Sequence, residues 1–255
     1  MRIDGARILL TGASGGLGGS IARELALRGA ELVLTARSEA VLRDLADRTG
    51  GEVEVRDLSN RDDLMALCES LADVDVLVAN AGVGGDLDPD RITTEEIDFV
   101  LDVNLRAPMI LANEFAQRRT EAGKRGQVVM VGSLSGLVAT ANTSLYNATK
   151  FGLRGYTLAI RQDWADRGIG ISLVAPGFIH TAGMAAEGMD LPKFVRTKSP
   201  QDVADAVVRA IVTNPAEVFV SPFELRASAL MGTVAPGFSE AVQRRLGVTE
   251  MARER

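Results

Sequence analysis

The sequence has few of the side chains that build several common kinds of site. Its 255 residues include one cysteine, Cys68, and one histidine, His180. A single cysteine excludes an intramolecular disulfide and a cysteine-rich zinc site. A Ser-His-Asp triad or a histidine-ligated metal would have to use His180. We therefore expect no metal site, and we expect Cys68 to be an inert core residue and His180 a loop residue.

Positive charge and long apolar runs are also scarce. The formal net charge is -6 and the pI is about 5.0, so we expect no broad nucleic-acid-binding surface. No run of about 18 apolar residues is present, so no transmembrane helix is predicted. Residues 1–5 lack the apolar stretch of a signal peptide. The expected location is the reducing cytoplasm.

Short apolar runs alternate with helical patterns along most of the chain. Strands that are apolar on both faces, separated by helices, are typical of a parallel sheet covered on both sides. The pattern predicts an α/β fold, with 1–255 as a single domain. Its architecture is a Rossmann-type doubly wound parallel sheet with helices on both faces. The expected strands are 6–11, 31–35, 52–56, 74–79, 127–131, 169–175 and 217–220.

Two segments depart from this alternation. Residues 178–199 are rich in Gly, Met and Ala and are too long for an ordinary connection, so we predict a substrate-binding lid. The C-terminal tail, 222–255, is weakly helical over 224–245, with interruptions at Gly232 and at Pro236 and Gly237. Its apolar residues have three open roles: covering the pocket, packing on a partner subunit or lying at a membrane surface. Burial against protein is the simplest.

A glycine-rich stretch follows the first predicted strand. Residues 11–18 read TGASGGLG and open the first predicted helix. Glycines let the backbone turn sharply and approach a pyrophosphate, while the free N–H groups of the helix start face the anion. No Gly-Lys-Ser/Thr follows, which excludes a Walker loop. The stretch predicts a dinucleotide site that uses Gly12, Ser14, Gly16, Leu17 and Gly18.

The end of the second predicted strand bears on the ribose chemistry. An NAD site usually carries an acidic residue about 20 residues beyond the glycines, where it binds the ribose 2′-OH. This chain has Arg37 there, and Glu39 already falls inside the next helix. The guanidinium fork suits a phosphate. Arg37 therefore favours NADP(H) over NAD(H).

A tyrosine and a lysine share one face of the predicted helix 145–167. Tyr146 and Lys150 are four residues apart, so their side chains project into the same space. A cation beside a phenol favours the phenolate, which makes a general acid/base usable near neutral pH.

These motifs, taken in order, resemble the short-chain dehydrogenase/reductase family over nearly the whole chain. Residues 11–18 match its TGxxxGxG loop, and Tyr146 with Lys150 match its YxxxK motif. The remaining matches are Asp57 and Leu58, an NAG motif at Asn80, Ala81 and Gly82, Gly132 and Ser133, and a PGxxxT segment with Pro176, Gly177 and Thr181.

The resemblance implies roles for individual residues. Tyr146 would be the acid/base at the substrate oxygen, and Ser133 would hydrogen-bond that oxygen. Lys150 would bind the nicotinamide ribose, and Asn104 would hold a water in a proton relay. Asp57 and Leu58 would contact the adenine, and Pro176, Gly177 and Thr181 would flank the nicotinamide.

The resulting expectation is an NADP(H)-dependent oxidoreductase that interconverts a carbonyl and an alcohol. Apolar residues in 134–143 and 178–195 favour an apolar small-molecule substrate. The family implies a homodimer or homotetramer. The alternative is a non-catalytic NADP(H)-binding sensor or scaffold of the same fold. A longer epimerase or dehydratase is disfavoured because only about 35 residues follow the seventh predicted strand.

Overall fold

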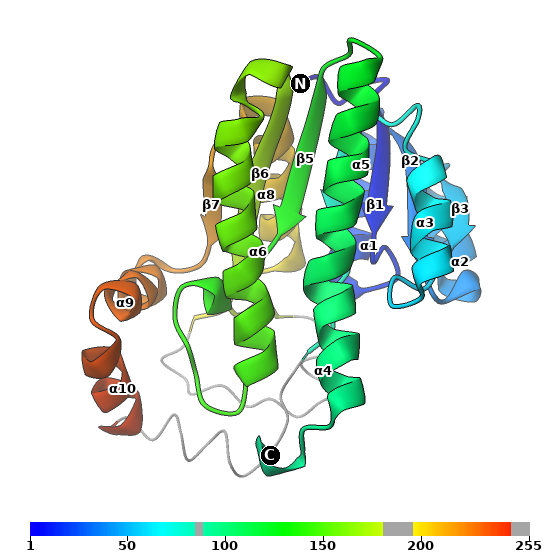
Figure 1. The fold of residues 1–255 in the computed structure, drawn as a ribbon. Helices are drawn as coiled ribbons and strands as arrows, with labels where there is room; N and C mark the ends of the chain where they lie inside the picture. Colours follow the sequence, from blue (N-terminus) through cyan, green and yellow to red (C-terminus); the bar gives the residue numbers. More distant parts are fainter. Residues whose placement is uncertain (85–88, 181–195, 246–255) are drawn as a thin grey trace.

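The computed structural model describes residues 1–84, 89–180 and 196–245. Within these residues, seven parallel strands form one sheet in the order β3-β2-β1-β4-β5-β6-β7 (Figure 1). The chain starts near the middle of the sheet, winds to one edge and then to the other, which confirms the predicted doubly wound topology. The strands are β1 (Arg7–Thr11), β2 (Glu31–Ala36), β3 (Glu52–Val55), β4 (Val76–Ala79), β5 (Gly126–Val131), β6 (Ile169–Pro176) and β7 (Glu217–Val220).

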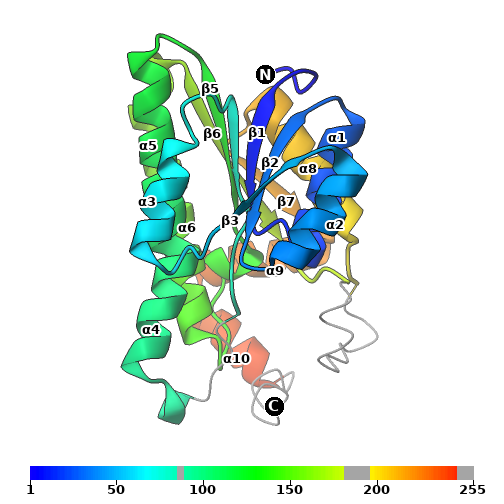
Figure 2. The ribbon, with the colours of Figure 1, turned by 90° about the vertical axis from the view of Figure 1, so that its right-hand side faces the viewer.

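Helices cover both faces of the sheet (Figure 2). One layer contains α1 (Gly16–Leu27), α2 (Glu39–Thr49) and α8 (Pro200–Thr213), and the other contains α3 (Arg61–Glu69), α5 (Ala107–Glu121) and α6 (Ser144–Asp163). Each helix buries one apolar stripe: Ile21 and Leu25 of α1 and Leu111 and Phe115 of α5 have no exposed surface. The core therefore lies in two clusters, one on each side of the sheet.

Side chains cap several of the helices at their N-terminal ends. The side chain of Asn60 caps α3, and Thr93 forms a capping box with Glu96 at the start of α4 (Thr94–Leu101). Ser38 occupies the N-cap position of α2, but its side chain makes no capping hydrogen bond. Ser38 instead lies on the wall of a groove described below.

Helix α4 continues into α5 through a π-helical turn, Asp102–Arg106. The backbone keeps right-handed helical angles throughout, and the amide of Ala107 donates to the carbonyl of Asp102, five residues back. Such wide turns are rare and often lie at functional sites.

The C-terminal tail is more regular than expected. It forms α9 (Phe223–Val234) and α10 (Pro236–Arg245). The predicted interruption at Gly232 is wrong: this glycine is inside α9, where a Cβ would lie 2.7 Å from Cγ2 of Val138. The break is at Ala235, because the residue before a proline is disfavoured in the α conformation.

Helix α9 packs on the residues that follow β5. The hydroxyl of Thr233 donates to the carbonyl of Leu137 at 2.8 Å. Leu134, Leu137 and Ala229 form a small buried cluster there. The outer side of the two helices is apolar and open, since Phe223 is 79% exposed and Val234 84%. Part of the tail is thus buried against protein, as expected.

Candidate functional site

The glycine-rich loop joins β1 to α1 and leaves no room for a side chain at Gly12 or Gly18. Gly12 has a left-handed φ of 66°, and a Cβ on it would lie 2.6 Å from Cα of Ala81. A Cβ on Gly18 would lie 2.1 Å from the carbonyl oxygen of Gly12. The first turn of α1 holds no acidic residue. Its N–H groups are therefore free of a competing carboxylate and suited to an anion.

Residues after β4 brace this loop. The side chain of Asn80 donates to the carbonyls of Thr11 at 3.0 Å and Gly12 at 3.1 Å. The hydroxyl of Thr11 in turn accepts from the amides of Asn80 and Ala81, each at 3.0 Å. The segment 80–82 therefore fixes the shape of the glycine loop.

A groove of about 800 Å³ runs along the carboxyl ends of β1 to β4. This edge of the sheet is where open α/β folds bind ligands. It brings together most of the residues expected to hold a cofactor: Gly12, Ser14, Gly16, Leu17, Gly18, Arg37, Asp57, Leu58, Asn80, Ala81 and Gly82. Pro176 and Gly177 are not part of its lining, and Thr181 lies outside the described residues.

Sequence reasoning missed Arg56, which lines the groove together with Arg37. Its guanidinium pairs with Glu54 at 3.0 Å and donates to the carbonyl of Val55 at 3.1 Å. Its Nε is buried without a hydrogen-bond partner among the described residues. The signal was present in the sequence, since Arg56 directly follows the third strand, as Arg37 follows the second.

Asp57 remains a carboxylate at the same edge. Burial alone would raise its pKa, but hydrogen bonds from the hydroxyl and amide of Ser59, together with nearby Arg37, hold the pKa below its ordinary value. The positive charge of the two arginines is therefore partly balanced within the groove.

Tyr146 and Lys150 lie one turn apart near the start of α6. The Lys150 side chain is 4% exposed. Its Nζ lies 5.4 Å from the centre of the Tyr146 ring and donates to the carbonyl of Val131 at 3.3 Å. The expected shared face is therefore observed, with a buried ammonium beside a phenol.

The π-helical turn carries Asn104. Its amide nitrogen donates to the carbonyl of Val83 at 2.9 Å, and its oxygen accepts from the amide of Val83 at 2.8 Å. The same nitrogen donates to the hydroxyl of Thr149 at 3.3 Å. A Cβ on Gly82 would lie 3.4 Å from Oδ1 of Asn104 and 3.5 Å from Nζ of Lys150. The end of the groove therefore meets α6 at Gly82.

Ser133 follows β5 and is half-buried. Its hydroxyl oxygen accepts from the amide of Ser135 at 3.1 Å. Gly177, just after β6, lies beside the next residue, since a Cβ on it would be 3.1 Å from Cδ1 of Leu134. The predicted strand-end residues thus gather at one edge of the sheet.

The two ends of the predicted lid are held together. Ile179 and Lys198 form a parallel β-bridge. The amide of His180 donates to the carbonyl of Lys198 at 2.9 Å, and the amide of Lys198 to that of Phe178 at 2.9 Å. Residues 181–195 of the lid lie outside the described residues.

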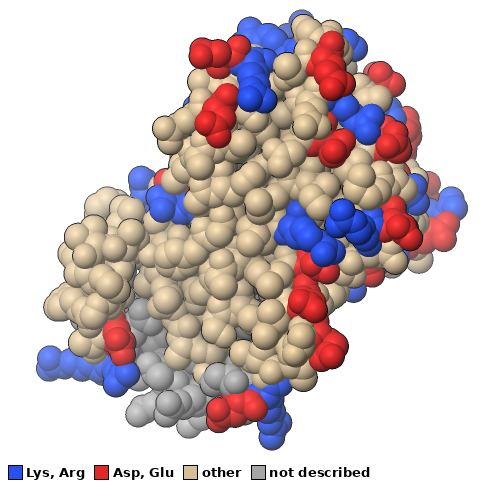
Figure 3. Space-filling model, viewed as in Figure 1, with Lys and Arg blue, Asp and Glu red and all other residues tan. Residues whose placement is uncertain are grey.

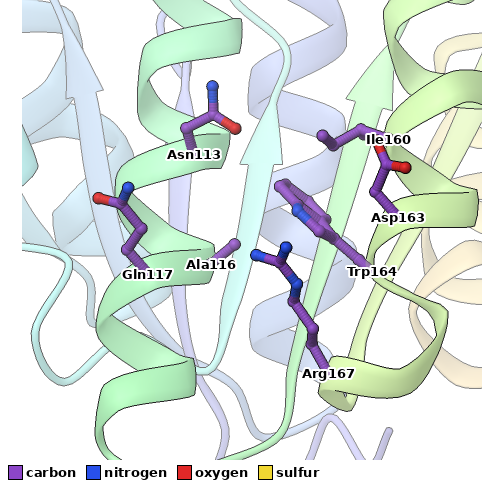
Figure 4. Close-up of a pocket in the computed structure, with 7 residues that line it drawn as sticks. All are labelled: Asn113, Ala116, Gln117, Ile160, Asp163, Trp164 and Arg167. Atoms are coloured by element: carbon purple, nitrogen blue, oxygen red, sulfur yellow. The ribbon is translucent and has the colours of Figure 1, made fainter.

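A second, smaller hollow of about 300 Å³ lies between α5 and the end of α6, among Asn113, Gln117, Asp163, Trp164 and Arg167 (Figure 4). It is at the opposite end of α6 from Tyr146, so it is not part of this site. In the described part of the chain, no cluster of three or more acidic, His or Cys side chains could hold a metal ion. Nor is any described helix long and apolar enough to cross a membrane.

Comparison with known proteins agrees with this geometry. A sequence profile of the short chain dehydrogenase family matches residues 6–191. The chain is 33% identical to a ketoacyl reductase, HetN, of Nostoc sp., over 99% of this chain and 93% of that protein. It is also 33% identical to the 3-oxoacyl-[acyl-carrier-protein] reductase FabG of Rickettsia bellii, over 80% of this chain and 88% of that protein.

Solved structures show the same fold with a nucleotide bound. A short-chain dehydrogenase from Sphingobium yanoikuyae in complex with NADPH has a TM-score of 0.76 at 28% identity, covering 92% of this chain and 95% of that one. A metagenomic short-chain oxidoreductase in complex with NADP has a TM-score of 0.74 at 31% identity, covering 87% and 99%. The chain belongs to the short-chain dehydrogenase/reductase family of oxidoreductases, whose members act on CH–OH and C=O groups.

Proposed function

We propose that the protein is an NADP(H)-dependent oxidoreductase that interconverts a carbonyl compound and an alcohol. The observation that carries this proposal is that Lys150, whose Nζ lies beside the Tyr146 ring, reaches the end of the groove at Gly82. This arrangement brings an acid/base pair to the place where a nucleotide laid along the glycine loop would end. When bound there, the nicotinamide would supply or accept the hydride.

The cofactor would be held by the groove. The amides at the start of α1 face the pyrophosphate, and the guanidinium groups of Arg37 and Arg56 suit a 2′-phosphate. Leu58 and Asp57 would contact the adenine. This charge pattern supports NADP(H) rather than NAD(H).

The chain's own groups would handle the proton and the substrate oxygen. In the reductive direction, Ser133 donates a hydrogen bond to the carbonyl oxygen. Tyr146 transfers its phenolic proton to that oxygen as the carbonyl carbon gains the hydride, which yields the alcohol. Lys150 stabilises the resulting phenolate and binds the ribose. Asn104 would hold a water through which the proton of Tyr146 is restored.

The substrate would be an apolar ketone or acyl-bearing carbonyl compound. Two relatives are named for the reduction of ketoacyl groups. The residues after Ser133 are mostly apolar or small. Gly177, just before the proposed lid 178–199, lies beside them, since a Cβ on it would be 3.1 Å from Cδ1 of Leu134. Phe178, the first residue of the proposed lid, is 39% exposed and offers an apolar surface.

Turnover with a carbonyl panel tests this function. The purified chain is titrated with NADPH and NADH by fluorescence and then assayed with ethyl acetoacetate, cyclohexanone and benzaldehyde at 340 nm. We expect tighter binding of NADPH and its oxidation with at least one ketone or aldehyde. Binding of NADPH without turnover of any would favour a sensor or scaffold instead.

We further propose that the protein is a homo-oligomer, a dimer or tetramer. From Ser144 to Ala159, the exposed residues of α6 are all small or apolar and recur at helical spacing, namely Ser144, Ala148, Phe151, Gly155 and Ala159; polar residues, Gln162 and Asp163, are exposed only at its last turn. The middle of this side of the molecule is largely uncharged, and charged side chains gather around it (Figure 3). Sedimentation velocity measures the mass, and a monomer at micromolar concentration would contradict the proposal.

A further inference from the structure

One buried side chain ties together the segment between Ser133 and Tyr146. Asn147 is 6% exposed and makes four hydrogen bonds. Its amide nitrogen donates to the carbonyls of Ser135 at 2.8 Å and Val138 at 3.0 Å. Its oxygen accepts from the amide of Thr140 at 3.2 Å and from the hydroxyl of Thr143 at 2.5 Å. Both halves of the amide are thus fully used.

The segment 134–143 depends on these bonds because it has little regular structure of its own. It contains one short 3-10 turn, Leu134–Gly136, and its residue Asn142 has a left-handed φ of 60°. The carbonyl of Val138 and the amide of Thr140 bond to the Asn147 side chain, as two neighbouring strands would bond to each other. The amide side chain therefore takes the place of a backbone partner.

The network also reaches the hydroxyl of Ser133. Asn147 holds the carbonyl of Ser135, and the amide of Ser135 donates to Oγ of Ser133. This bond uses a lone pair of the hydroxyl oxygen and leaves its hydrogen for another acceptor. At its other end, Asn147 directly follows Tyr146 in α6. One side chain therefore connects the two groups that would meet the substrate oxygen.

We propose that Asn147 is a positioning residue for the reaction: it fixes the Ser133 hydroxyl and the segment 134–143 relative to Tyr146. The inference rests on the proposed function, since it assumes that Ser133 and Tyr146 address one substrate oxygen. A misplacement of about 1 Å in such a pair can lower the rate by about 100-fold. Asn147 is not part of the lining of the cofactor groove.

The test uses a near-isosteric variant. Asn147→Asp keeps the shape of the side chain but removes both N–H donors, so the carbonyls of Ser135 and Val138 lose their partners. Helix α9 still holds the segment through the bond from Thr233 to Leu137, so we expect the variant to fold. Asn113→Asp is the control, because Asn113 is exposed on α5 and its oxygen, retained in Asp, accepts from Tyr156 at 3.1 Å.

Three quantities are compared in the full-length chain: kcat/KM for the fastest carbonyl compound of the panel, the Kd of NADPH, and amide exchange of peptides within 134–143. For Asn147→Asp we expect kcat/KM to fall about 100-fold. We expect the Kd of NADPH to stay within about twofold and the peptide amides to exchange about tenfold faster. Thr143→Val, which leaves both donors of Asn147, should give a smaller fall. Asn113→Asp should match the wild type.

The outcomes separate the two proposals. Faster exchange with unchanged kcat/KM would overturn the positioning role. A parallel loss of NADPH binding and melting temperature would also overturn it, because that pattern indicates a merely structural residue. A wild-type chain that binds NADPH and turns over no carbonyl compound would end the proposed function, and the positioning role with it. Because this result is seen in the wild-type chain, it is distinguished from a failure of the positioning role, which is seen only in the variants.

Discussion

Arg37 and Arg56 leave the sheet side by side. Ala36 and Val55 are paired in register at the ends of β2 and β3, and the amide of Arg56 donates to the carbonyl of Ala36 at 3.2 Å. Neighbouring strands are about 4.8 Å apart, so two guanidinium groups start from adjacent backbone positions. Such a pair of like charges is most stable with an anion between them. Arg56 is therefore a second cation, beside Arg37, that supports the proposed preference for NADP(H).

Removing either cation should weaken the binding of the phosphorylated cofactor selectively. For Arg37→Gln and Arg56→Gln we expect the Kd of NADPH to rise about tenfold each, which corresponds to about 1.4 kcal/mol for a charge-assisted contact. The Kd of NADH should stay within about twofold. Arg43→Gln, an exposed cation paired with Glu39 on α2, controls for the loss of charge alone. A similar rise for NADH would place these arginines away from the 2′-phosphate.

The two tyrosines of the chain allow a matched test of the acid/base. Tyr146→Phe should lower kcat by about 100-fold or more while NADPH still binds, because only proton transfer is lost. Tyr156→Phe is the control: Tyr156 lies further along α6, and burial raises its pKa to about 12. Steady-state kinetics and a fluorescence titration measure both variants. If Tyr146→Phe retains full turnover, the assigned acid/base is wrong.

A methyl group at Gly18 should disrupt the loop. Gly18→Ala would place a Cβ 2.1 Å from the carbonyl oxygen of Gly12, so the backbone must move. We expect a loss of about 1–3 kcal/mol of stability and at least tenfold weaker NADPH binding. Gly237→Ala in α10 is the control, because its new Cβ meets nothing within 4 Å and we expect little change in stability. Urea unfolding compares the two, and equal stabilities would contradict the loop geometry.

Cys68 should resist thiol reagents in the folded protein. It has no exposed surface, and burial raises its pKa to about 11. The reactive thiolate is therefore scarce at pH 8 and out of reach. We expect Ellman's reagent to label almost no Cys68 thiol in buffer, and about one thiol per chain in about 6 M guanidinium. Rapid labelling of the native protein would mean that α3 opens readily.

The sequence was sufficient to predict the strands and the helices that cover them. The runs in β1, β4 and β5 are apolar on both faces, and that pattern has one common architecture. The π-helical turn around Asn104 could not be predicted. A single extra residue in one turn changes the spacing of apolar residues too little to be recognised in a short helix. Gly232 was misread since a glycine required by a neighbour's side chain looks like a helix breaker.

The candidate site could be predicted where its residues form motifs along the chain, and not where they come together through the pairing of distant segments. The glycine loop, Tyr146 and Lys150 were predicted as members of the candidate site from their spacing. Arg56 and Asn147 were not, because their partners come from pairings between distant segments. Arg56 is notable only beside Arg37, and Asn147 only against the carbonyls of Ser135 and Val138.

The position of Asn104 depends on the number of residues in the π-helical turn as well as on their identity. A residue in an α-helix turns the chain by about 100°, so the extra one in Asp102–Arg106 sets the phase between two stretches of a single helix. Within the turn Asn104 binds Val83, and beyond it Leu111 and Phe115 of α5 enter the core. Deleting one residue from the turn would rotate α5 relative to α4, so the contacts of Asn104 and those of Leu111 and Phe115 could not both be kept. A deletion here should therefore be far less tolerated than any substitution at an exposed position of the same helix.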